Sequence, residues 1–253
     1  ATPRGYQAGG KVVKVISVHG TILPRADMMA AMSGAVSLAS FQKVFREAAD
    51  DPNVAAIVLD IDSPGGQVDQ VPETVALIRA ARRADRPIIA VANTLAASAA
   101  YWLASGADEI VVTPSGEVGS IGVYMMHQDI SERLKQEGVS PNFIFEGARK
   151  VEGNPYEPLS AEARGALQSS VRAYYEMFTK DVAKARGVPT SVVRADPEKT
   201  DKHMGGGRCY SAVEAVRLGM ADRVATLDDT IQRAARGGKS RRASLERRRL
   251  ALI

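Results

Sequence analysis

Cysteine and histidine are scarce in this chain of 253 residues, and it has no long apolar run. The single cysteine, Cys209, excludes intramolecular disulfide bonds and zinc sites built from several cysteines. Only His19, His127 and His203 could serve as histidine bases. No stretch approaches the roughly 18 consecutive apolar residues of a membrane-spanning helix, and residues 1–10 have no apolar segment resembling a signal peptide. We therefore expect no membrane span, no metal site and no cofactor.

Positive charge is concentrated at the C-terminal end. From residue 236 onward there are seven Lys and Arg side chains against the single acid Glu246, a net charge of +6 that leaves about −2 for the rest of the chain. Such a tail predicts a solvated extension, with contact to nucleic acid or an acidic partner as the alternative. A chain of this length can bury a large core without disulfides. We predict one α/β domain over residues 1–235 and a basic tail over residues 236–253.

Strand-like and helix-like segments alternate along the chain. Apolar or β-branched runs predict strands at residues 11–18, 54–61, 88–92, 109–112 and 142–145. Apolar residues at helical spacing predict helices at residues 40–49, 71–82, 99–104, 129–137, 160–186 and 211–218. Residues 23–37 show no period and are expected to form a mobile loop. The alternation predicts strands that pair in parallel through right-handed crossovers.

The first segment that could carry chemistry is the turn from Asp62 to Val68, which contains Gly65 and Gly66 and joins a buried strand to a helix. Glycines allow a ligand to approach the backbone closely, and N–H groups at the start of a helix attract negative charge. Such a turn could hold a phosphate or stabilise an oxyanion, or it could be a purely structural connection.

The second segment surrounds Ser98, which follows another buried strand and is flanked by four alanines. Small neighbours leave space for a substrate to reach the hydroxyl, and the helix that starts here offers the Ala99 N–H as an oxyanion donor. The alternative is that Ser98 only caps the helix. A serine nucleophile also needs a base. His127, with Asp129, would complete a Ser–His–Asp triad.

Lys150 is the other candidate base, since it follows directly after the strand predicted at residues 142–145. To accept a proton near neutral pH, a lysine must lower its pKa from about 10.4 by roughly three units, which corresponds to about 4 kcal/mol. Burial against apolar groups and a hydroxyl partner could achieve this, whereas most loop lysines are solvated. Cys209, with His203 six residues before it, is a weaker candidate nucleophile and is expected to be an inert thiol.

Four segments, in this order, resemble a known family. They are Ser63-Pro-Gly-Gly-Gln-Val68, Ala96-Ala-Ser-Ala-Ala-Tyr-Trp102, Ser115-Gly-Glu-Val-Gly-Ser-Ile-Gly-Val123 and Gly207-Arg-Cys-Tyr-Ser-Ala-Val-Glu-Ala-Val-Arg-Leu-Gly-Met-Ala-Asp222. They resemble the signal peptide peptidase A family of serine proteases, and more closely its phage-encoded branch, the protease and scaffold proteins of head assembly. The similarity covers about residues 11–225, and the four ordered motifs together make it specific.

The resemblance implies the fold of Clp protease and the crotonases, a parallel sheet of repeated ββα units with an extended C-terminal helix. It also implies a Ser–Lys dyad. In the short form of the family the base follows the nucleophile by about fifty residues, and Lys150 follows Ser98 by 52. The serine of the Gly-Ser-Ile-Gly motif, here Ser120, would hydrogen-bond the lysine amine and orient it.

In the same comparison, Gly66 and Ala99 would supply the N–H groups of an oxyanion hole, and Gly65 would shape the turn. Cellular members often have two glycines after the nucleophile, where this chain has Ala99 and Ala100. This difference should stiffen the start of the helix and narrow the pocket, but it keeps the N–H donor. The membrane anchor of cellular members has no counterpart in this sequence, which favours the phage branch.

The sequence therefore predicts a serine endopeptidase that acts through an acyl-enzyme, in the cytoplasm of a bacterial or phage-infected cell. The expected partners are a peptide or protein substrate, such as a capsid scaffold or portal protein, and further copies of the chain in a homo-oligomer. Two alternatives stay open. One is an assembly protein without proteolytic activity, and the other is a crotonase-like acyl-CoA enzyme that would use the same oxyanion N–H groups.

Overall fold

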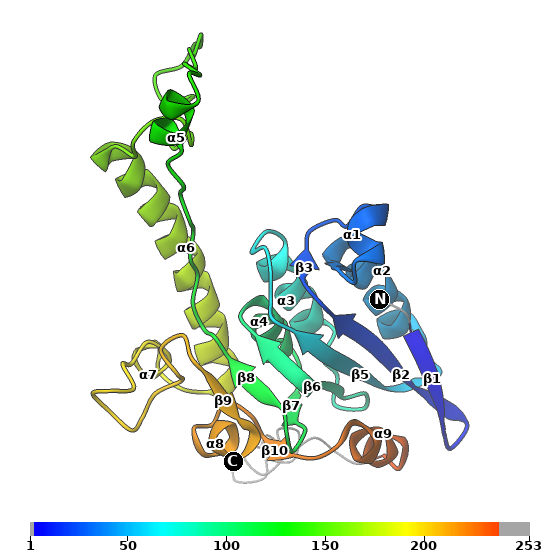
Figure 1. Ribbon diagram of the computed structural model, residues 1–253. Helices are drawn as coiled ribbons and strands as arrows, with labels where there is room; N and C mark the ends of the chain where they lie inside the picture. Colours follow the sequence, from blue (N-terminus) through cyan, green and yellow to red (C-terminus); the bar gives the residue numbers. More distant parts are fainter. Residues whose placement is uncertain (1–2, 238–253) are drawn as a thin grey trace. The chain divides into compact units, whose positions relative to one another are not determined.

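The computed structural model describes residues 3–237, which form two compact units (Figure 1). The sheet unit comprises residues 3–122 and 177–237, and the insert unit comprises residues 123–176. Residues 238–253 of the predicted basic tail lie outside the described residues. Within residues 3–237, no helix is both long enough and apolar enough to cross a membrane. The same residues contain no group of three His, Cys, Asp or Glu side chains that could hold a metal ion.

The sheet unit is built on a largely parallel sheet of eight strands. Along the main path the strand order is β1 (Pro3–Ala8), β2 (Lys11–His19), β5 (Val54–Ser63), β6 (Ile88–Ala97), β7 (Glu109–Val112) and β10 (Arg223–Val224). Two further strands leave this path, β8 (Glu117–Gly119) and β9 (Cys209–Ser211). Only the β1–β2 and β8–β9 pairs are antiparallel. A separate pair consists of β3 (Ile22–Leu23) and β4 (Val36–Ser37).

Nine helices lie within the described residues. They are α1 (Met28–Met32), α2 (Leu38–Asp50), α3 (Val71–Ala80), α4 (Ala99–Ser105), α5 (Ser131–Gln136), α6 (Ala161–Arg186), α7 (Thr190–Val193), α8 (Ala212–Arg217) and α9 (Leu227–Ala235). Helix α5 belongs to the insert unit, and α6 begins in the insert unit and ends in the sheet unit.

Both faces of the sheet are buried, as the continuous apolar run of β5 predicts. Successive side chains of a strand point to opposite faces. Ile57, Leu59 and Ile61 therefore pack in the cluster that includes α2, α3 and α4, whereas Val58 packs in the cluster that includes Ile231 of α9. This burial fixes the carboxyl ends of β5 and β6, from which the candidate catalytic turns emerge.

Helices α4 and α6 are joined by an aromatic contact within the sheet unit. The rings of Trp102 and Phe178 stack with their centroids 4.6 Å apart, and both side chains are fully buried. The indole Nε1–H of Trp102 also donates to the Asp181 carboxylate at 2.9 Å. Because the stack fills the core behind α4, it holds the first turn of this helix, and with it Ser98, in a fixed position.

The structure confirms the strands predicted at residues 11–18, 54–61, 88–92 and 109–112, and it confirms all six predicted helices to within a few residues. Residues 23–37, expected to form a mobile loop, contain α1, β4 and the second residue of β3.

The strand predicted at residues 142–145 is wrong. Ile144 and Phe145 are exposed there, and no described strand pairs with them. An apolar segment forms a strand only where a neighbour accepts its backbone hydrogen bonds.

Candidate active site

Ser98 lies between β6 and α4 in a strained backbone conformation. Its φ is 52° and its ψ is −123°, and Gln70 and Ser120 are the only other described non-glycine residues with positive φ. Such a conformation costs about 1–3 kcal/mol and persists only where the surrounding structure enforces it. Here the Ser98 N–H donates to the Gly119 carbonyl at 2.9 Å, and the Trp102 N–H donates to the Ser98 carbonyl at 3.0 Å. A strained strand-to-helix turn of this kind is a known way to present a nucleophilic serine.

The hydroxyl of Ser98 does not cap α4. The side chain accepts no hydrogen bond from the start of the helix, so the capping alternative is not what the structure shows. The side chain is partly exposed, while Ala97 and Ala99 on either side of it are buried. The small neighbours expected from the sequence thus pack into the core and leave the hydroxyl accessible.

The Gly65–Gly66 turn packs directly against Ser98. A Cβ atom added to Gly65 would lie 2.7 Å from the Ser98 Cβ and 3.0 Å from the Ala99 backbone nitrogen. Gly65 also has a φ of 98°, a left-handed conformation that side chains disfavour. Only glycine therefore allows this turn to approach the serine so closely.

The Gly66 N–H points away from the neighbouring strand segment at Ile22. The Ile22 N–H donates to the Gly65 carbonyl at 2.8 Å, and the Gln67 N–H donates to the Ile22 carbonyl at 2.9 Å. In an extended chain successive N–H groups point to opposite sides. The Gly66 N–H therefore points to the side of the turn opposite Ile22.

The Ala99 N–H is at the first position of α4, where a helix leaves its N–H groups without a helical acceptor. Within the described chain, neither Gly66 nor Ala99 donates a backbone hydrogen bond to the protein. Two N–H groups beside a serine hydroxyl are the donors that an oxyanion requires.

Ser120 follows β8, the strand next to β6, which ends just before Ser98. Ala97 of β6 pairs with Gly119 of β8, so Ser98 and Ser120 are the next residues of two paired strands. Ser120 has a φ of 53°, and its N–H donates to the Arg208 carbonyl at 2.9 Å. The structure thus brings together five of the six predicted site residues, namely Gly65, Gly66, Ser98, Ala99 and Ser120.

Lys150 belongs to the insert unit, whereas the other five site residues belong to the sheet unit. It ends a turn in which its N–H donates to the Gly147 carbonyl at 2.9 Å, and its side chain is exposed. Its predicted role as base therefore stays a prediction.

The three histidines are held by other groups. The His19 Nε2 lies 3.0 Å from a carboxylate oxygen of the buried Asp60. The His127 Nε2–H donates to the Asn154 carbonyl at 2.9 Å. The His203 Nδ1 accepts the Gly205 N–H at 3.1 Å.

Asp129 does not orient His127 as a triad would require. Its carboxylate accepts the Ser131 N–H at 2.9 Å, and hydrogen bonding with Ser131 keeps the pKa of Asp129 below its ordinary value. The Ser98–His127–Asp129 alternative thus lacks the hydrogen bond between base and acid that defines a triad.

Cys209 is a poor nucleophile. Burial raises the pKa of its thiol, and the nearby Glu117 carboxylate raises it further. A thiol attacks as the thiolate, so both effects reduce its reactivity. This agrees with the expectation of an inert thiol.

Ser63 is a site residue that the sequence did not reveal. It is fully buried, its hydroxyl donates to the Gly20 carbonyl at 2.6 Å, and the same oxygen accepts the Gly65 N–H at 3.1 Å. The hydroxyl therefore ties the glycine turn to the chain that leads into Ile22. The sequence did not indicate this role, because Gly20, the hydrogen-bond partner of Ser63, lies 43 residues away along the chain.

Replacing Ser63 with alanine should lower the free energy of unfolding by about 1–3 kcal/mol, because the buried Gly65 N–H and the partly buried Gly20 carbonyl lose their partner. We also expect kcat for peptide hydrolysis to fall by about tenfold with little change in KM, since the Gly66 N–H loses its fixed position. Urea unfolding and steady-state kinetics measure both effects. Ser33→Ala, which removes an exposed serine bonded to the Met29 carbonyl, is the matched control. Equal results for the two variants would contradict the positioning role of Ser63.

Comparison with known proteins places this chain in a family. The family model described as "Peptidase family S49" matches residues 80–241 of this chain. The chain is 34% identical to the Capsid assembly protease C of Escherichia phage lambda, over 90% of this chain and 49% of that protein. It is 27% identical to the Putative signal peptide peptidase SppA of Enterococcus faecium, over 88% of this chain and 63% of that protein.

The chain thus spans about half the length of the phage relative. Among solved structures, the 1510-N membrane-bound stomatin-specific protease matches with a TM-score of 0.53 and 16% identity, over 92% of each chain. This last similarity concerns the fold alone. The sequence matches confirm the resemblance inferred from the four motifs, and the chain belongs to peptidase family S49.

Proposed function

We propose that this chain is a serine endopeptidase in which Ser98 is the nucleophile and Lys150 the general base. The observation that carries the proposal is the strained backbone of Ser98, whose side chain does not cap α4 and whose Cβ lies against Gly65. Strain at a serine with no structural task of its own is typical of a catalytic position. Membership in peptidase family S49 supports the same assignment.

In the proposed mechanism the neutral Lys150 amine takes the Ser98 proton as Oγ attacks the scissile carbonyl carbon. The carbonyl oxygen becomes an oxyanion and is held by the Gly66 and Ala99 N–H groups. The lysine then gives its proton to the leaving amine, which leaves an acyl-enzyme on Ser98. Water, deprotonated by the same lysine, hydrolyses this ester. The Ser120 hydroxyl hydrogen-bonds the lysine amine and orients it.

The exposure of Lys150 leads to the second part of the proposal, a homo-oligomer. A lysine can act as a base only when water is removed from around it. Outside residues 122–129, the insert unit also exposes large apolar side chains at Val139, Ile144 and Phe145. Apolar exposure of this extent is typical of an interaction surface. We propose that further copies of the chain cover this surface and that they, or bound substrate, desolvate the lysine.

The biological role that we propose is cleavage of proteins during phage head maturation in the cytoplasm of the host cell. The similarity to a phage capsid assembly protease supports it. Candidate substrates are a capsid scaffold or portal protein. In this proposal residues 1–235 act as one protease domain with the Clp protease and crotonase fold. A purely assembly-related role is the second candidate, and the exposed apolar surface of the insert unit favours it.

Trapping of the nucleophile tests the proposal most directly. We expect a fluorophosphonate reagent to modify one serine of the full chain, and peptide mapping by mass spectrometry to locate the adduct at Ser98. The Ser98→Ala variant should remain unlabelled, whereas the Ser33→Ala variant should be labelled as fast as the parent. An adduct on another serine, or equal labelling of the Ser98→Ala variant, would show that the assignment is wrong.

A further inference from the structure

Residues 122–129 form an extended segment whose main chain is unpaired. The segment belongs to no helix or strand, and within the insert unit no main-chain hydrogen bond joins residues 123–129 to another described residue. The first such bond comes at Ile130, whose N–H donates to the Pro155 carbonyl. An extended chain with free N–H and C=O groups is a template to which another strand can pair.

The side chains of this segment alternate as those of a strand do. Those of Met125, His127 and Asp129 line a pocket, although Met125 and Asp129 are also exposed, whereas the intervening Tyr124, Met126 and Gln128 do not line it. A peptide paired with this segment would place its own alternate side chains on the same two sides, one of which is the pocket.

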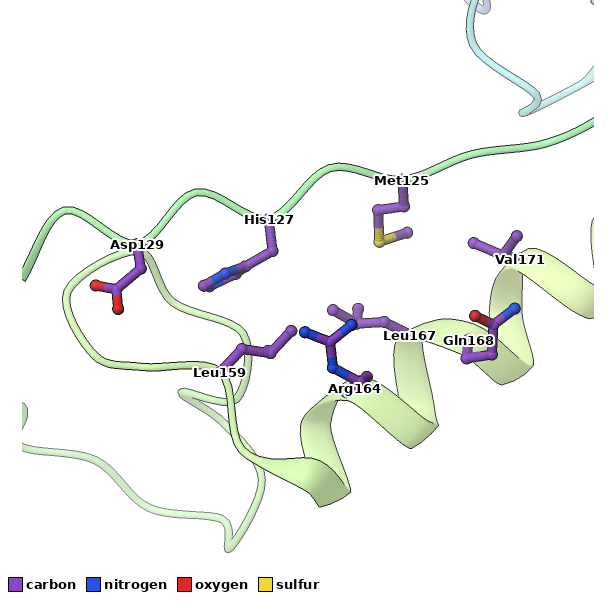
Figure 2. Close-up of a pocket in the computed structure, with 8 residues that line it drawn as sticks. All are labelled: Met125, His127, Asp129, Leu159, Arg164, Leu167, Gln168 and Val171. Carbon is purple, nitrogen blue, oxygen red and sulfur yellow. The ribbon is translucent and has the colours of Figure 1, made fainter.

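Figure 2 shows this pocket, which lies between the segment and the first half of α6 and encloses about 390 Å³. One part of the lining is apolar and the other is polar. The apolar residues are Met125, Leu159, Leu167 and Val171, and the polar residues are His127, Asp129, Arg164 and Gln168.

Arg164 is the charged group that remains available to a ligand. Figure 2 shows its guanidinium extending from α6 toward the segment, between Leu159 and Leu167. Within the insert unit, no hydrogen bond or ion pair links the Arg164 side chain to another described residue. Asp129, the only acid of the lining, is held by Ser131 instead.

The remaining polar groups of the lining suit a ligand that Arg164 could bind. The His127 Nε2 must carry a proton, because it donates to the Asn154 carbonyl, so only Nδ1 is left for a ligand. Gln168 adds an amide donor to the lining. A cation and an amide next to apolar walls fit a carboxylate on a short apolar stem.

We propose that residues 122–129 bind an extended segment of a substrate protein by strand addition, and that the pocket receives a glutamate side chain of that segment. This rests on the proposed function, because the bound segment is taken to be substrate. It goes beyond it in assigning a binding site to the insert unit and an acidic residue to the preferred substrates.

The test uses the full chain with Ser98→Ala, which binds peptide without cleaving it. Fluorescence anisotropy follows a short labelled peptide of alternating valine and serine with a central glutamate, and a second peptide with glutamine in its place. We expect the glutamate peptide to bind about tenfold more tightly, as hydrogen bonds to a charged group do. Arg164→Gln should remove this difference. Arg172→Gln, which changes an exposed α6 arginine outside the pocket, should keep it.

Strand addition makes a separate prediction. Methylating alternate backbone nitrogens of the glutamate peptide, on the side that faces the protein, should abolish binding. Hydrogen exchange should slow at residues 122–129 when the unmethylated peptide is bound. Equal affinity of the two peptides, protection elsewhere only, or no binding at about 1 mM would overturn the proposal.

A second copy of the chain could occupy the segment instead of substrate. In that case residues 122–129 would be protected without peptide, increasingly so at higher protein concentration, and the proposal would be wrong. None of these readouts needs a nucleophile. Failure here therefore leaves the Ser98 assignment intact, and failure of the Ser98 assignment leaves the binding result valid.

Discussion

Replacing either Ser98 or Lys150 with alanine is expected to lower kcat for peptide hydrolysis by about 10⁴-fold or more while leaving the fold unchanged. The serine supplies the atom that attacks, and without the lysine its proton has no acceptor. Because both groups act in one step, the double variant should be no slower than either single variant. Casein, or a scaffold protein from a related phage, is a suitable substrate for the assay.

Lys135→Ala is the matched control for the lysine. Lys135 also belongs to the insert unit and is exposed, and it has only a weak pairing with Glu132, with 3.9 Å between the charged atoms. Exposed pairs of this kind contribute little to stability, so this variant should keep parental activity. Urea unfolding of all variants should show nearly equal stability.

The pattern of losses also distinguishes the alternatives. Full activity of both Ser98→Ala and Lys150→Ala would exclude the dyad and favour an assembly role. Loss in Ser98→Ala with full activity in Lys150→Ala would mean that another residue is the base. His127→Ala tests the triad alternative, and we expect it to retain activity because the His127 imidazole is bonded to the Asn154 carbonyl.

The central strands were predictable because burial on both faces leaves a continuous apolar run in β5 and in the first half of β6. The second half of β6 was not, since Asn93 and Thr94 interrupt the run. It exists because Leu95 to Ala97 pair with β8, a three-residue strand too short to show a pattern. The false strand at residues 142–145 has the opposite cause, since its composition suits a strand but the described chain offers it no neighbour.

The candidate site was predictable in its residues but not in its geometry. Motifs identified Ser98, Ser120 and the glycine turn, yet no sequence pattern reports that both serines have positive φ. Those angles follow from pairing between β6 and β8, which joins distant parts of the chain. The role of Ser63 depends on Gly20 in the same way. Long-range contacts decide such details, and local sequence does not contain them.

Replacing Gly65 with alanine should abolish catalysis, because the new Cβ atom would clash with Ser98. The new Cβ would lie 2.7 Å from the Ser98 Cβ and 2.9 Å from the Ala97 carbonyl oxygen, closer than real contacts allow. Both neighbours lie at the end of a buried strand and cannot move away easily. We expect kcat to fall by about 10²-fold or more, because a displacement of about 1 Å at a reacting atom has effects of that size.

Gly187→Ala is the control for Gly65→Ala. It places an alanine in a left-handed backbone conformation without a steric clash. Gly187 has a φ of 68°, but a Cβ added there would meet nothing within 4 Å. The Gly187→Ala variant should therefore lose only about 1–2 kcal/mol of unfolding free energy, which is the cost of the backbone conformation, and it should keep its activity. Gly65→Ala should lose more stability than this and nearly all activity. Because Gly65 has no side chain and no proposed chemical role, loss of activity in a Gly65→Ala variant that is still folded would show that the close approach of Gly65 to Ser98 is needed for catalysis. Retained activity would mean that the turn can move away from Ser98, and the oxyanion hole assigned to Gly66 would then need another donor.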